Sequence, residues 1–222
     1  FKDNILQLQQ KGNVVMIVSV INEKGGSGKT SLAINLACKL NDEGDKVLLL
    51  DLDPQRSAEV FVSIRKSEKL KEAFVYERKL IDLKSYDSVI IDTGGRDSKE
   101  MHYALQNADI VLIPTYPSQY DLAVLNHMIE LFKKEAKANA KCFIIINRAF
   151  TNTSLKPKIK EFKELILNKT NQNIILMDSI LYDREAIRRA TSEGIGITQT
   201  QSNKAKRDFS LFFDELLTKY NA

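Results

Sequence analysis

A stretch near the start of the chain combines three glycines with two lysines and a threonine: Lys24, Gly25, Gly26, Ser27, Gly28, Lys29 and Thr30. Glycine lets backbone N–H groups converge on phosphate oxygens without a clash of side chains. A lysine directly after the last glycine can reach the outer phosphates of a nucleotide, and the following hydroxyl can bind Mg²⁺. We therefore expect a phosphate-binding loop here, with Ser31 as its last member and Thr30 as a metal ligand.

The context of this stretch decides between two interpretations. It lies between a predicted strand and a predicted helix, as a phosphate loop requires, because the helix adds its positive N-terminus to the site. The alternative is a glycine-rich turn with two solvated lysines. Glu23 stands where the usual pattern has glycine, and Lys24 adds a second cation beside Lys29. Since a cation at the outer phosphates stabilises the charge on transferred phosphoryl oxygens, Lys29 is a candidate catalytic residue, and the place of Lys24 beside it is unusual for such a loop.

Three aspartates follow apolar, strand-like runs, where Mg²⁺ chemistry needs them. Asp92 ends the run 89–91 and has the position of a carboxylate on the metal or on a metal-bound water. Asp51 and Asp53 follow the run 47–50, and the two-residue period of a strand places them on one face. One of them could hold a metal-bound water while the other orients the attacking water. Spacing alone leaves that assignment open.

The elements that position these residues alternate along the chain. Six short apolar runs rich in β-branched residues predict buried strands at 14–21, 47–50, 89–91, 110–113, 143–146 and 174–177. Helical periodicity fills the gaps at 30–40, 118–138, 159–167, 184–192 and 206–220. The alternation predicts an α/β fold of the P-loop NTPase type, a mostly parallel, twisted sheet with helices on both faces. We expect a single domain over 1–222 with a short N-terminal extension at 1–13. Residues 57–86 have the weakest pattern and carry no assignment.

Composition and charge narrow the possible classes. Hydrophobic residues make up 43% of the 222 residues and charged residues 28%, as in globular chains, and no apolar run approaches the roughly 20 residues of a membrane span. Cys38 and Cys142 form no disulfide framework, so a reducing cytoplasm is the expected setting. Residues 112–222 carry 17 Lys and Arg against 12 Asp and Glu. The most basic region predicts either a DNA-binding patch or a solvated face, and comprises Arg184, Arg188, Arg189, Lys204, Lys206 and Arg207.

Taken together, these motifs resemble those of the ParA/MinD family of deviant Walker A ATPases. The loop at 24–30 is similar to the family's Walker A box, residues 51–55 to the motif after its second strand, and residues 92–98 to its Walker B segment. Residues 108–122 and 183–196 resemble two further segments of the family. The resemblance runs from residue 14 to the end of the chain and is greatest for the small ParA-type partition ATPases.

The resemblance implies a mechanism. Such proteins bind Mg-ATP and form a sandwich homodimer, in which Lys24 of one subunit would contact the phosphates held by the other. By motif position, Asp53 would orient the attacking water and Asp51 would couple to Mg²⁺, while Asn147 would lie near adenine. The ATP-bound dimer of the family binds DNA without sequence preference, which implies a cytoplasmic, nucleoid-associated protein. A ParB-like, centromere-binding partner stimulates its hydrolysis.

Two other functions fit parts of the pattern. A MinD-like positioning ATPase would bind a membrane through a C-terminal amphipathic helix. The apolar stripe within 209–220 has helical spacing, but we interpret it as a helix that docks on the core, and we expect no membrane partner. A metabolic P-loop ligase or kinase would need an acceptor pocket, and no motif for one is present.

Overall fold

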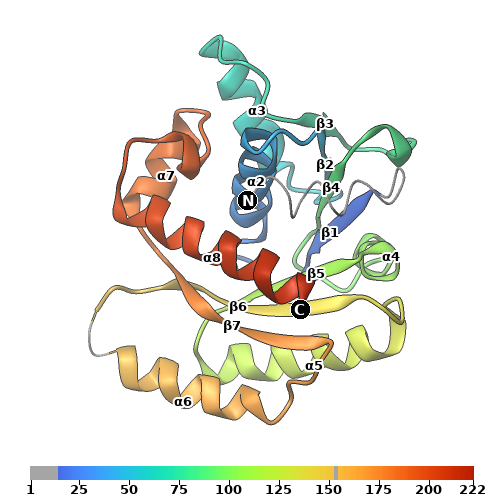
Figure 1. Cartoon of the computed structure of the whole chain (residues 1–222), viewed down its shortest axis with the longest axis vertical. Helices are drawn as coiled ribbons and strands as arrows, with labels where there is room; N and C mark the ends of the chain where they lie inside the picture. The colour runs from blue at the N-terminus through green and yellow to red at the C-terminus, as the bar shows by residue number, and fades with distance from the viewer. Residues whose placement is uncertain (1–14, 153–154) are drawn as a thin grey trace.

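The computed structural model describes residues 15–152 and 155–222, so the proposed extension at 1–13 lies outside the described residues. Its centre is a seven-stranded sheet in the order β3-β2-β4-β1-β5-β6-β7, and all pairings between these strands are parallel. The strands are β1 Met16–Val20, β2 Val47–Asp51, β3 Val75–Glu77, β4 Ser88–Asp92, β5 Ile110–Thr115, β6 Lys141–Ala149 and β7 Ile174–Tyr182. The predicted parallel α/β architecture is confirmed (Figure 1).

Helices cover both faces of this sheet. Within the described residues they are α2 Lys29–Asp42, α3 Ser57–Ser67, α4 Lys99–Asn107, α5 Gln119–Glu135, α6 Lys156–Leu167, α7 Glu185–Ser192 and α8 Lys204–Asn221, with 3₁₀ turns η1 Leu83–Ser85 and η3 Ile197–Gln199. Side chains of α2, α3, α7 and α8 enter one apolar core, and those of α4, α5 and α6 enter the other. In Figure 1, α5 and α6 lie on one side of β6 and β7, and α8 lies on the other.

The central strands are buried because helices pack on both of their faces. All five residues of β2 and of β4 are buried. Alternate residues of β4 enter different cores: Ile90 lies in the core that contains α2 and α8, whereas Val89 and Ile91 lie in the core that contains α4 and α5. Two-sided burial explains why these strands appear in the sequence as unbroken apolar runs rather than as alternating patterns.

The structure adds α3, β3 and η1 within 57–86, where the sequence carried no assignment, and it adds α4, which the sequence analysis did not predict. Of these, β3 is a three-residue edge strand that pairs with β2. At the other end of the chain, Phe209, Phe212 and Phe213 of α8 are buried, so the predicted stripe docks on the core. No helix in the described ranges is both long enough and apolar enough to cross a bilayer.

Candidate functional site

The glycine–lysine stretch follows β1 and leads directly into α2, the geometry of a phosphate loop. Gly28 is the N-cap of α2 and has φ +89°, a left-handed conformation that side chains rarely adopt. A Cβ at Gly28 would lie 2.5 Å from Nδ2 of Asn147, so the loop packs directly on the end of β6. The free N–H groups and the positive dipole end of α2 give this loop the chemistry of an anion site.

The loop that follows β4 lies against the phosphate loop. A Cβ at Gly95 would be 2.9 Å from the backbone nitrogen of Gly25, so only glycine at position 95 allows the two loops to approach this closely. Because β1 and β4 are neighbours in the sheet, this contact brings the carboxylate at the end of β4 to the phosphate loop.

Lys29 is the first residue of α2, and only 6% of it is exposed. Its Nζ donates a 3.2 Å hydrogen bond to the backbone carbonyl of Lys24, across the loop. Burial lowers the pKa of Lys29, and the carboxylates of Asp92 and Asp53 oppose that shift. The ammonium is therefore desolvated and held over the loop, where a phosphate group would be a strong counter-charge.

Asp92 and Asp51 stand side by side, because β2 and β4 pair with these two residues opposite each other, and both are completely buried. Among the described residues, neither carboxylate oxygen of Asp92 has a hydrogen-bond partner at standard distance and angle, although the Thr30 hydroxyl lies near enough to favour the charged form. Burial, together with the nearby charges of Asp51 and Asp53, raises the pKa of Asp92 to about 7. The Thr30 hydroxyl and the Lys29 ammonium act in the opposite direction and lower this pKa. Two unpartnered carboxylate oxygens beside a threonine hydroxyl are oxygen ligands of the kind Mg²⁺ prefers, so these residues fit the metal.

Asp51 and Asp53 differ in their surroundings. The Asp53 N–H donates to Oδ1 of Asp51 at 3.0 Å, and the Tyr76 hydroxyl donates to Oδ2 at 2.9 Å. Burial raises the pKa of Asp51, whereas both hydrogen bonds favour its charged form. Burial and the adjacent Asp51 raise the pKa of Tyr76, so its hydroxyl keeps the proton that it donates. Asp53 is slightly exposed and accepts a 2.9 Å bond from the N–H of Gln55, which suits a group that meets water.

Lys24 lies at the rim of the loop. Its side chain is 41% exposed, and its Nζ forms a 2.7 Å ion pair with Oδ2 of Asp121. Asp121 is buried in the first turn of α5, where the N-cap residue Ser118 also hydrogen-bonds to it. Tyr116 and Phe150 form an edge-to-face pair and line the same hollow as Lys24. A contact between Lys24 and a second subunit would require this ion pair to open.

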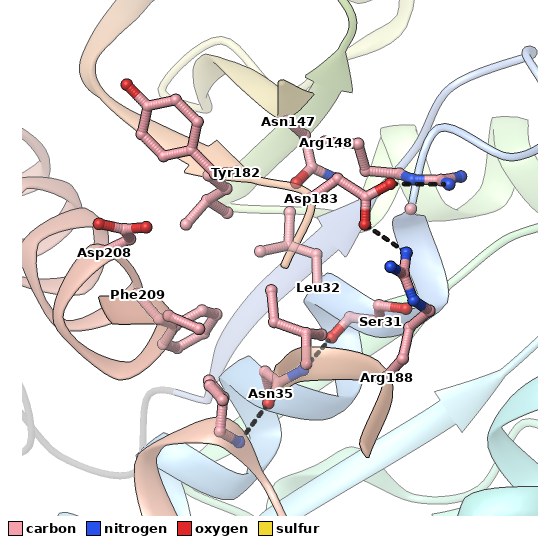
Figure 2. Close-up of a pocket in the computed structure, with 15 residues that line it drawn as sticks. Ser31, Leu32, Asn35, Asn147, Arg148, Tyr182, Asp183, Arg188, Asp208 and Phe209 are labelled. Atoms are coloured by element: carbon pink, nitrogen blue, oxygen red, sulfur yellow. Dashed lines mark hydrogen bonds and ion pairs between the residues drawn. The ribbon is translucent and has the colours of Figure 1, made fainter. Parts of the chain in front are cut away.

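A cavity of about 280 Å³ adjoins the phosphate loop, between the start of α2, the ends of β6 and β7, and helices α7 and α8 (Figure 2). Asn147 lies in its wall, and its Nδ2 donates to the Ser27 carbonyl at 2.8 Å. That bond fixes the amide and leaves its oxygen to accept a hydrogen bond. Leu32 and Phe209 add apolar surface, so the cavity suits a planar base held by one fixed polar group.

Two residues in this wall were not predicted. Arg148 donates from Nη1 to the Gly26 carbonyl at 2.6 Å, and its Nη2 lies 3.5 Å from Oδ2 of Asp183. Asp183 also binds Arg188 at 2.6 Å, so one carboxylate bridges two guanidinium groups (Figure 2). Arg148 has φ +56°, a conformation that persists in a non-glycine residue only where surrounding contacts fix it. The sequence offered one indication that Arg148 belongs to the site, because it directly follows Asn147, which was predicted to lie near adenine.

The six cations of the basic region do not form one free patch. Three of them are engaged within the chain: Arg184 with Asp208, Arg188 with Asp183, and Lys206 with the Thr200 carbonyl. The other three are exposed and have no ion-pair partner in the described part of the chain: Arg189, Lys204 and Arg207. The region available to an anionic partner is therefore about half of the predicted set.

The strand order places the phosphate loop at the centre of the sheet. Because β4 lies between β1 and β2, the aspartates at the ends of β2 and β4 line up beside the loop that follows β1. This topology and site define an α/β protein of the P-loop NTPase type. Residues 18–197 match the family described as the CobQ/CobB/MinD/ParA nucleotide binding domain. The chain belongs to this family, which confirms the resemblance to the ParA and MinD ATPases.

Two similar proteins come from Gloeobacter kilaueensis and Rhizobium radiobacter. The chain is 29% identical over 197 residues to maintenance of carboxysome distribution protein A of Gloeobacter kilaueensis, covering 86% of this chain and 87% of that protein. It is 27% identical over 179 residues to protein ParA of Rhizobium radiobacter, covering 77% of this chain and 79% of that protein.

Solved structures share the fold. A plasmid partition protein of Borrelia burgdorferi bound to AMPPNP aligns with a TM-score of 0.68 and 20% identity, over 93% of this chain and 100% of that one. The pNOB8 ParA bound to nonspecific DNA aligns with a TM-score of 0.59 and 16% identity, over 92% of this chain and 99% of that one. At these identities the alignments establish the fold.

Proposed function

We propose that the protein is a Mg-ATP-dependent, dimerising ATPase that binds DNA without sequence preference and drives DNA partition together with a centromere-binding partner protein. One observation carries the proposal: the buried Lys29 ammonium and the unpartnered carboxylate of Asp92 meet at the phosphate loop. Membership of a nucleotide-binding family and the similarity to a ParA protein support it.

The chain's own residues suggest how the site would act. Loop 24–31 would bind the phosphates of ATP through its backbone N–H groups, and the cavity beside Asn147 would take the base. Thr30 and Asp92 would hold Mg²⁺, which supplies charge neutralisation at the outer phosphates. Lys29 would contact the same phosphates from above the loop. Asp53, at the more exposed edge, would accept a hydrogen bond from the attacking water and so orient it.

Dimerisation would complete the site. Lys24 is half-exposed at the rim and lines one hollow together with Tyr116 and Phe150, an arrangement suited to a contact between two subunits. In the dimer, Lys24 would exchange Asp121 for the phosphates bound by the partner subunit. Nucleotide would then join two chains, and its hydrolysis would release them.

The exposed cations of α7 and α8 would bind DNA. Arg189, Lys204 and Arg207 are few in one chain, and each phosphate contact adds only a modest, salt-sensitive contribution. A dimer presents this set twice, so its attachment becomes bivalent and its affinity rises steeply. DNA binding would therefore follow ATP, and the ATP-bound protein would reside on the nucleoid in the cytoplasm.

Retention on a random-sequence DNA surface tests the proposal. We expect retention with Mg-ATP but not with Mg-ADP or without nucleotide, and a steep loss as salt rises. The triple variant Arg189→Ala, Lys204→Ala, Arg207→Ala should lose it. A matched control removes three exposed lysines of α6, on the opposite face of the sheet: Lys156, Lys158 and Lys160. DNA retention that is the same with Mg-ATP, with Mg-ADP and without nucleotide would contradict the proposal. An equal loss of retention in the α6 control variant and in the triple variant would contradict it as well.

A second candidate is the positioning of a protein cargo, which is favoured by the 29% identity to a carboxysome-distribution protein over 86% of this chain. The two functions differ in the partner that stimulates ATP hydrolysis. Acceleration by a centromere-binding protein on its DNA site supports partition, and its absence while DNA retention is intact supports cargo positioning. Direct membrane attachment through α8 is disfavoured, because Phe209, Phe212 and Phe213 are buried. Flotation with liposomes and ATP tests that point.

A further inference from the structure

The short edge strand β3 and the residue directly after it contact Asp51, the last residue of β2, and the nearby Asp53. The Tyr76 hydroxyl donates to Oδ2 of Asp51 at 2.9 Å, and Nη2 of Arg78 lies 3.4 Å from the backbone carbonyl of Asp53. Within the described residues, Tyr76 is the one side chain that hydrogen-bonds to the Asp51 carboxylate. The other partner of that carboxylate is the backbone N–H of Asp53.

Strand register explains this reach. In the parallel pair of β2 and β3, Tyr76 lies opposite Leu49. Leu49 and Asp51 are two residues apart and share a face, so a long side chain at position 76 extends along that face to the carboxylate. Arg78 lies one residue beyond the end of β3. Tyr76 of β3 thus holds the Asp51 carboxylate, and the guanidinium of Arg78 reaches the backbone of Asp53.

We propose that Tyr76 is a positioning residue for the metal site: its hydroxyl holds one oxygen of Asp51, so that the carboxylate keeps the orientation in which it couples to Mg²⁺. The inference rests on the proposed function, in which Asp51 assists the metal held by Thr30 and Asp92. Partners in the outer shell of a metal site orient the groups nearer to the metal. Asp51 is completely buried, and a hydroxyl on a rigid ring restricts its rotation more firmly than mobile water does.

A purely structural role for Tyr76 predicts different behaviour. In that case the hydrogen bond would only offset the burial of Asp51, and its loss would lower the melting temperature without altering the response to Mg²⁺. The two roles are separated by a double-mutant cycle with Tyr76→Phe, which removes the hydroxyl alone, and Asp51→Asn. The measured quantity is the Mg²⁺ concentration that gives half-maximal enhancement of binding of a fluorescent ATP analogue, with the melting temperature recorded in parallel.

We expect Tyr76→Phe to raise that Mg²⁺ concentration roughly 10- to 100-fold, while binding without Mg²⁺ stays unchanged. In the Asp51→Asn background the same substitution should have no further effect, because the group it positions is gone. Tyr86→Phe is the matched control; Tyr86 lies in the same part of the chain, and its ring faces Lys46. Tyr86→Phe should leave the Mg²⁺ requirement unchanged.

Each other outcome overturns the inference, and in distinguishable ways. If Asp51→Asn changes the Mg²⁺ requirement but Tyr76→Phe does not, Tyr76 is structural and the proposed function stands. An equal effect of Tyr76→Phe in both backgrounds would mean that it acts independently of Asp51. If Asp51→Asn itself leaves the requirement unchanged, the role given to Asp51 in the proposed function fails, and the inference fails with it.

Discussion

Replacing Asp92 by asparagine should change how the stability of the nucleotide-free protein depends on pH. Burial raises the pKa of Asp92 from 3.8 to about 7, so the folded protein binds a proton there that the unfolded chain releases near pH 4. The contribution of Asp92 to the free energy of unfolding is therefore greatest below pH 4 and is lost as the pH rises to about 7. At about 1.4 kcal/mol per pH unit, the full loss is about 4 kcal/mol. About 3 kcal/mol of it falls between pH 5 and pH 8.

Asp92→Asn removes the titrating group and keeps the shape. The buried amide has unsatisfied groups of its own, so the informative quantity is the trend with pH rather than the difference at one pH. The free energy of unfolding of the variant, relative to wild type, should rise by about 3 kcal/mol from pH 5 to pH 8. For a chain of this size that is roughly 6 to 12 °C in melting temperature, which differential scanning fluorimetry resolves.

The control is Asp214→Asn, which alters an exposed carboxylate of α8 and should show a far smaller trend. Saturating Mg²⁺ and ATP should raise the wild-type melting temperature more at pH 8 than at pH 5, because a bound cation favours the charged carboxylate. A difference between Asp92→Asn and wild type that stays constant across this pH range would refute the reasoning.

Four further substitutions test the phosphate loop, its rim and the carboxylate beside it. Lys29→Ala should abolish Mg-ATP binding measured by calorimetry, and unchanged affinity would contradict the phosphate-loop assignment. Lys24→Ala should keep nucleotide binding but lose ATP-driven dimerisation in light scattering, whereas normal dimers would refute a role across the interface. Asp121→Asn removes the ion pair that holds Lys24, so it should lower the ATP concentration needed for dimerisation about two- to fivefold. That range corresponds to about 0.5–1 kcal/mol for an ion pair whose lysine is partly exposed. A higher ATP requirement in the variant would show that the ion pair does not restrain Lys24. Asp53→Ala should accumulate an ATP-bound dimer with little phosphate release, and wild-type turnover would assign the water-orienting role elsewhere.

Local patterns predicted the central part of the fold and the position of the candidate phosphate loop between a strand and a helix. The loop is a contiguous segment between a strand and a helix, and Asp51 and Asp92 end strands whose burial on both faces makes them visible as apolar runs. Parallel pairing then brings the two aspartates side by side without further information from the sequence. The sequence left the roles of Asp51 and Asp53 open, because only the folded structure reveals that Tyr76 and a backbone N–H hold the first of them.

Contacts between distant residues could not be predicted in this way. β3 has three half-buried residues, and its position depends on pairing with β2, so its own sequence gives a weak signal. The ion pair between Lys24 and Asp121 joins residues 97 positions apart. In the basic region, composition identified six cations, but it could not reveal that Arg184 is occupied by Asp208 from the next helix.

Phosphate release from ATP by the purified chain, with Mg²⁺ and with Mg²⁺ chelated, tests the central claim most directly. The claim is that loop 24–31 and the carboxylates of Asp92 and Asp53 form a Mg-ATPase site. The account predicts release that requires Mg²⁺ and that disappears in both Lys29→Ala and Asp53→Ala, while the exposed Asp214→Asn control retains it. Release that continues in Lys29→Ala, or that proceeds equally well without Mg²⁺, would contradict the account.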